Sequence, residues 1–125
     1  MTDDIKAQVL GIAPLIVALR RDLHKHPEPG WKEYRTASLA ARHLLDLGYK
    51  VTMGADAVRA EARLTVPDPA TCARERRRAV AEGADPELVA RMGDGLTGLW
   101  ADLVCPGPAP EGERPGPLVA LRFDM

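Results

Sequence analysis

The chain has 125 residues, of which 46% are hydrophobic and 28% are charged, a composition typical of folded proteins rather than disordered ones. Its 17 basic and 18 acidic side chains give a net charge of −1, which excludes a strong overall attraction to nucleic acid or to an anionic membrane. The apolar runs are too short to span a bilayer, and the acidic start at residues 1–4 is unlike a secretory signal. Cys72 and Cys105 form no CxxC pair, so we expect no zinc knuckle and a reduced, cytoplasmic setting.

A first helix is predicted to end at His26. Apolar residues recur at steps of three and four along it, which predicts one buried stripe. The stripe consists of Ile5, Val9, Ile12, Ile16, Leu19 and Leu23. Gly11 and Pro14 weaken the middle of this segment, because proline cannot donate the helical hydrogen bond to Leu10. We therefore expect a kink there, or two abutting helices.

The turn that follows is rich in histidine, proline and glycine. His24 and His26 lie where the helix dipole favours positive charge, which predicts a capping role, although an extended backbone would let the pair hold a metal. Glu28 and Glu33 are either a carboxylate pair or caps for the exposed amides of the next helix. Trp31, like Trp100 later, is expected in the core or at its edge.

A second helix is predicted from about residue 33 to 47, followed by a short strand at 49–52. Gly48 stands at the position favoured for a C-terminal helix cap. The inner side of this helix is expected to carry Ala37, Ala40, Ala41, Leu44 and Leu45.

Residues 70–91 favour helix but have few apolar residues, and Asp85 with Pro86 can begin a new helix after Gly83. This pattern predicts a mostly solvated helical insertion at about 65–95. Acidic residues dilute its basic side chains and no aromatic residues interleave for base stacking, so we expect a solvated face rather than a nucleic-acid site. The basic residues are Arg74, Arg76, Arg77 and Arg78.

Two further strands are predicted at residues 96–104 and 118–123, joined by an exposed loop at 106–116. The second is almost continuously apolar, which predicts a strand covered on both faces. Together the elements predict an α/β fold in which helices pack on a mixed sheet.

A family resemblance begins in the turn, which reads RDLHKHPE over residues 21–28. With Trp31 and residues 33–37 it is similar to the LHxxPE opening of the metal-dependent aminoacylase and carboxypeptidase amidohydrolases. Residues 29–51 resemble the subgroup that contains the p-aminobenzoyl-glutamate hydrolases. Residues 117–125, PLVALRFDM, resemble the start of the family's ALRADMDALP segment.

The resemblance implies that residues 1–125 are the incomplete N-terminal part of a zinc-peptidase-like catalytic domain, without the dimerisation domain. The implied reaction is hydrolysis of the amide of N-acyl amino acids or p-aminobenzoyl-glutamate-like substrates by a full-length homodimer or heteromer with two divalent metals, zinc or manganese. The implied ligands lie beyond Met125, so no metal ligand is expected within this chain. Asp124 alone is carried over, as an orienting or near-metal carboxylate or otherwise a solvated strand-end residue, and Arg122 stands where other branches place a metal-binding histidine.

The isolated chain is therefore expected to be inactive. A self-contained, non-catalytic interaction module is the alternative, with the HKHPEPGW turn and the arginine-rich helix as partner surfaces. A dipeptidase of the same broad family is a third possibility.

Overall fold

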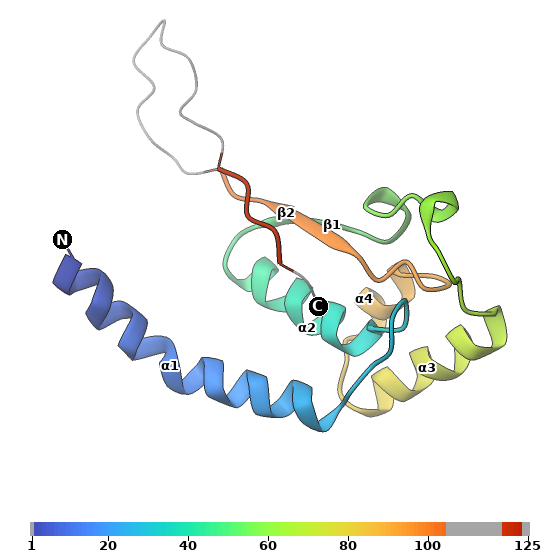
Figure 1. The fold of residues 1–125 in the computed structure, drawn as a ribbon, viewed down its shortest axis with the longest axis horizontal. Helices are drawn as coiled ribbons and strands as arrows, with labels where there is room; N and C mark the ends of the chain where they lie inside the picture. The colour runs from blue at the N-terminus through green and yellow to red at the C-terminus, as the bar shows by residue number, and fades with distance from the viewer. Residues whose placement is uncertain (1, 105–118, 124–125) are drawn as a thin grey trace, which may run out of the picture.

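The structure is a computed structural model that describes residues 2–104 and 119–123. Figure 1 shows helices α2, α3 and α4 gathered beside a small sheet, while α1 extends away from them. In chain order the elements are α1 (Thr2–Lys25), α2 (Tyr34–Asp46), β1 (Lys50–Met53), the 3-10 turns η1 (Gly54–Asp56) and η2 (Ala60–Ala62), α3 (Pro69–Ala81), α4 (Pro86–Arg91) and β2 (Leu99–Asp102).

The sheet of the described residues has two antiparallel strands, with Lys50 opposite Asp102 and Met53 opposite Leu99. The predicted mixed sheet is therefore wrong within this part of the chain. Residues 119–123 are exposed and form no strand, so the predicted covered strand is also wrong there. The apolar composition of residues 118–123 is typical of a strand, but the partner of β1 in the sheet is β2. Leu118 and the loop at 106–116 lie outside the described residues.

The core lies between α2, the two later helices and β1. It is formed by Tyr34, Ala37, Ala41, Val51, Met53, Cys72, Ala79, Ala84, Leu88, Val89 and Met92. Most of residues 70–91 are exposed or only partly buried, as expected, but the segment also supplies part of the core. These helices bury small residues such as Cys72 and Ala79, which add little to an apolar pattern judged by large side chains.

Helix α2 agrees with its prediction to within one residue at each end. Gly48 follows it with a φ of +84°, the left-handed conformation expected of a glycine cap. Leu45 was predicted to face inward but is exposed, whereas the buried Arg35 and Ser38 were not predicted. Both are polar and lie on the side of the helix that contacts the later helices, so an apolar pattern could not identify them.

Helix α1 contradicts its predicted burial. Ile5 is 56% exposed and Ile16 is 53% exposed, although both lie on the predicted stripe. The segment is one continuous helix through Pro14 rather than two. Within the described residues, no helix combines the length and the apolar character needed to cross a membrane.

The predicted break before α4 is confirmed, and Asp85 is the N-terminal cap of α4. The Asp85 carboxylate accepts hydrogen bonds from the backbone N–H of Glu87 at 2.9 Å and of Leu88 at 3.3 Å, and it also pairs with Arg42. The bond from Arg42 is the main reason that the pKa of Asp85 lies below its ordinary value of 3.8, and the amide bonds act in the same direction.

The lowered pKa of Asp85 predicts a specific acid sensitivity. Because the folded pKa is the lower one, the carboxylate stabilises the fold above the unfolded pKa of about 3.8, and this contribution is lost as the pH falls through the folded value. We expect the free energy of unfolding of Asp85→Asn to depend less on pH than wild type in this acid window. Urea unfolding at a series of pH values measures the difference, and parallel pH profiles would contradict the assignment.

Candidate functional site

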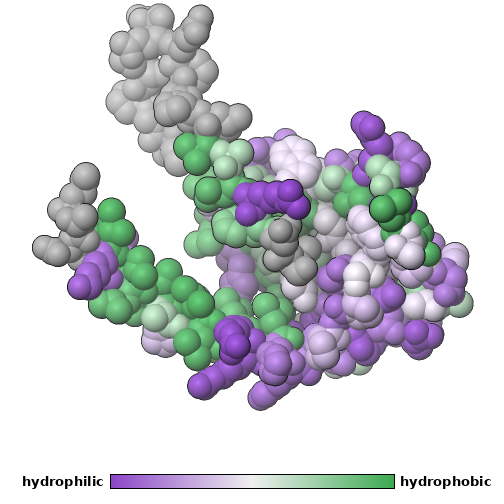
Figure 2. All heavy atoms as spheres, viewed as in Figure 1, coloured by the Kyte–Doolittle hydropathy of each residue, from purple (hydrophilic) through white to green (hydrophobic). Residues whose placement is uncertain are grey.

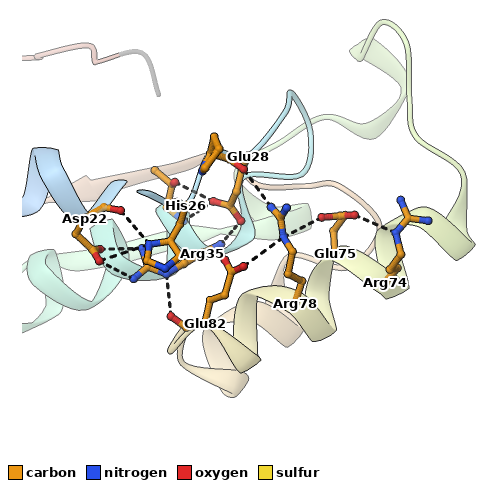
Figure 3. Close-up of polar contacts among 10 residues, drawn as sticks. Asp22, His26, Glu28, Arg35, Arg74, Glu75, Arg78 and Glu82 are labelled. Atoms are coloured by element: carbon orange, nitrogen blue, oxygen red, sulfur yellow. Dashed lines mark hydrogen bonds and ion pairs between the residues drawn. The ribbon is translucent and has the colours of Figure 1, made fainter. Parts of the chain in front are cut away.

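The turn between α1 and α2 carries the RDLHKHPE motif, and Glu28 fixes its geometry (Figure 3). The Glu28 carboxylate accepts hydrogen bonds from the backbone N–H groups of Arg35 and Thr36 and from the Thr36 hydroxyl, each at 2.8 Å. The predicted capping role is therefore confirmed for Glu28. Glu33 does not cap the helix, since its carboxylate accepts a hydrogen bond from the Thr97 hydroxyl at 2.7 Å. The two carboxylates have separate partners.

His26 has a structural role at the end of α1. Its Nδ1 lies 2.9 Å from the Asp22 carbonyl oxygen, which can only accept, so this nitrogen is the donor. The same nitrogen is 3.6 Å from the Asp22 carboxylate. The capping role predicted for this histidine is confirmed, while His24 is exposed. Nowhere in the described part of the chain do three His, Cys, Asp or Glu side chains cluster so that they could hold a metal.

Arg35 joins the ends of three helices. Its guanidinium donates two hydrogen bonds to the Asp22 carboxylate, at 2.8 and 3.0 Å, and a third to the backbone carbonyl of Glu82 at 2.9 Å. The hydrogen bonds from Arg35 are the main reason that the pKa of Asp22 lies below its ordinary value, and the charge of His26 acts in the same direction. This planar pairing holds α1 and the end of α3 to the start of α2.

Arg74 and Arg77 of α3 are exposed, as predicted for a solvated face, whereas Arg76 and Arg78 are partly buried and pair within the chain. Arg78 donates to the Pro27 carbonyl at 3.2 Å and pairs with Glu75 at 3.2 Å and Glu82 at 3.9 Å (Figure 3). Arg76 pairs with Asp94 at 2.7 Å. The basic groups are thus matched to carboxylates and carbonyls of the same chain.

Tyr34 organises the other side of the motif, and no sequence pattern predicted this role. Its hydroxyl donates to the Gly93 carbonyl at 2.9 Å and accepts from the Gly95 N–H at 2.8 Å. Burial is the main cause that raises the pKa of Tyr34 far above its ordinary value, and the Cys72 thiol adds to it. Tyr34 is therefore neutral at physiological pH and acts as a structural link. The run Gly93-Asp94-Gly95 is the only hint in the sequence, because it marks a tight loop whose backbone groups need hydrogen-bond partners.

The remaining sequence candidates divide between the described and undescribed residues. Asp124 and Cys105 lie outside the described residues, and Arg122 is exposed. Trp31 is partly buried, with its indole N–H donating to the Leu64 carbonyl at 2.9 Å. Trp100 is 50% exposed, so the prediction that it lies in the core or at its edge is wrong. The contacts among the described residues hold the helices and loops in place. They do not bring together a nucleophile with a general base, or a set of metal ligands.

Comparison with known proteins gives a consistent result. The chain is 41% identical over 114 residues to an indole-3-acetyl-aspartic acid hydrolase of Enterobacter agglomerans, covering 91% of the chain and 24% of that protein. It is 39% identical over 117 residues to a subunit of the p-aminobenzoyl-glutamate hydrolase of Escherichia coli, covering 94% of the chain and 25% of that protein. No protein-family model matches it.

A solved structure extends this likeness to three dimensions. The crystal structure of an aminobenzoyl-glutamate utilization protein from Klebsiella pneumoniae matches 77% of the chain and 24% of its own chain, with a TM-score of 0.74 and 38% identity. The chain therefore spans about a quarter of the length of the relatives that it matches.

Proposed function

We propose that the chain belongs to the family of the amidohydrolases that it matches over nine-tenths of its length, and that it forms part of a larger enzyme. Residues 1–125 are the N-terminal part of a catalytic domain that hydrolyses the amide bond of N-acyl amino acids or p-aminobenzoyl-glutamate-like substrates. The strongest support is that the chain matches about a quarter of a relative in sequence and about a quarter of a solved chain in structure. The helical segment at 65–95 belongs to this part, and a dimerisation domain belongs to the rest.

The metal chemistry of such an enzyme would need ligands from elsewhere. The described residues do not fit a metal centre, since no suitable group of side chains lies together among them. We propose that zinc or manganese is held by the rest of the enzyme, with Asp124 as an orienting or near-metal carboxylate. The described residues would hold this part of the domain in shape through Glu28, Arg35 and Tyr34.

The proposed partners follow from the same comparison. The Escherichia coli relative is named a subunit, which supports an assembly of more than one chain, either a homodimer or a heteromer. The substrate is a small amide, with no part for nucleic acid or membrane, and the location is cytoplasmic. The internal pairing of Arg76 and Arg78 supports this choice over an interaction module, because these charges already have partners within the chain.

A chimaeric enzyme tests the proposal. In the chimaera, the chain replaces the matching quarter of the Escherichia coli subunit. The chimaeric subunit is produced together with the other components of that hydrolase, and hydrolysis of p-aminobenzoyl-glutamate is measured with added manganese or zinc. We expect hydrolysis by the chimaera and none by the purified 125-residue chain under the same conditions, because the chain alone lacks a ligand set among its described residues. A folded chimaera without activity would contradict the proposal, as would hydrolysis by the chain alone.

A further inference from the structure

The exposed apolar surface of α1 is the largest feature that the proposed role does not yet explain. Figure 2 shows apolar spheres along the helix, with open space between most of it and the body of the molecule. The exposed large side chains are Ile5, Val9, Leu10, Ile12, Leu15, Ile16 and Val17, each between 45% and 64% exposed. Soluble proteins rarely leave so continuous an apolar surface in water, so this helix needs a cover.

The shape of this surface indicates what kind of cover fits. Ile5, Ile12 and Ile16 share one stripe at helical spacing, but Leu10 and Val17 lie to one side of it and Leu15 to the other. A pair of identical helices buries one narrow stripe on each partner. The arc on α1 is wider than that stripe, and a helix with a broad apolar surface is typical of the interior of a larger domain.

A second exposed apolar segment is at the other end of the chain. Val119 and Leu121 are each 76% exposed and Phe123 is 82% exposed. The relatives are about four times as long as this chain, so in them three quarters of the polypeptide is available as a cover.

We propose that residues 5–17 of α1 and residues 119–123 form the seat for the remaining three quarters of the amidohydrolase polypeptide. This inference rests on the proposed function. The occupant is a set of apolar elements of the same enzyme, packed against the arc of α1. Until these elements are present, the charged motif at residues 22–35 anchors only the C-terminal end of the helix.

Two matched double variants test the proposal in the chimaeric enzyme. Ile12→Asp/Ile16→Asp places two charges in the proposed contact, whereas Ala7→Asp/Ala18→Asp places two charges on the side of α1 that carries small residues. We expect the first variant to lower the melting temperature of the chimaera by several degrees and the second to have a much smaller effect. In the 125-residue chain alone, both should leave the melting temperature nearly unchanged, because all four positions are exposed.

The outcomes separate the two proposals. An unchanged melting temperature of the Ile12→Asp/Ile16→Asp chimaera would overturn the seat even if the unsubstituted chimaera is active. A clear loss of stability in a folded but inactive chimaera would support the seat and contradict the function. If sedimentation shows that the chain alone dimerises, or if it binds phosphatidylglycerol vesicles, and Ile12→Asp/Ile16→Asp abolishes that behaviour, a second copy or a lipid surface is the occupant and the proposal is wrong.

Discussion

Gly54→Ala is expected to destabilise the fold by roughly 2–5 kcal/mol. Gly54 follows β1 with a φ of +69°, which costs a residue with a Cβ about 1–2 kcal/mol. A Cβ at this position would lie 2.1 Å from the backbone carbonyl oxygen of Arg91, at the end of α4. This atom is backbone, so it cannot move aside as a flexible side chain would, and the overpacking adds about 1–3 kcal/mol.

Gly48→Ala is the matched control, because it separates the two causes. Gly48 has a similar φ of +84°, but a Cβ there would meet no atom within 4 Å. The Gly48→Ala variant should therefore lose only the conformational contribution to the free energy of unfolding, about 1–2 kcal/mol. Urea unfolding of both variants gives the comparison. Equal losses would show that Gly54 does not lie against the Arg91 carbonyl at the end of α4.

How much the sequence could predict depended on whether a residue's role is local. Capping by Asp85 and the left-handed Gly48 were predictable because each acts within a few residues of its own position. The sheet was not, because pairing between β1 and β2 joins segments about fifty residues apart. An apolar run at 118–123 could not indicate which strand would lie beside it.

The contacts of the motif show the same division. Capping by Glu28 could be anticipated from its place before a helix, although Glu33 seemed equally suitable. The partners that Arg35 and Tyr34 find in the later part of the chain could not be anticipated, since they lie 47 and 59 positions further along. The buried face of α1 was predicted from a real pattern, but the described residues contain nothing that covers it.

Tyr34→Phe is expected to destabilise the fold by about 1–3 kcal/mol, because it removes one oxygen that serves two buried loop groups. The Gly93 carbonyl would keep its hydrogen bond from Arg76, so the larger loss falls on the Gly95 N–H. That amide also has a longer bond of 3.2 Å to the Gly93 carbonyl, which favours the lower half of the range. Tyr49→Phe is the control, since the Tyr49 side chain packs against the core but its hydroxyl makes no hydrogen bond within the described residues.

The same substitution should change how the fold responds to alkali. Because burial raises the pKa of Tyr34 in the folded state, the neutral hydroxyl stabilises the fold below the unfolded pKa of about 10, and this contribution is lost as the pH rises toward the folded value. Wild type should therefore lose stability above about pH 10 more steeply than Tyr34→Phe. Thermal unfolding from about pH 8 to about pH 11, a range that brackets the ordinary tyrosine pKa, tests this expectation. If the two profiles are parallel, the Tyr34 hydroxyl is not buried between the two glycines, and the loop at 93–95 must be held by other contacts.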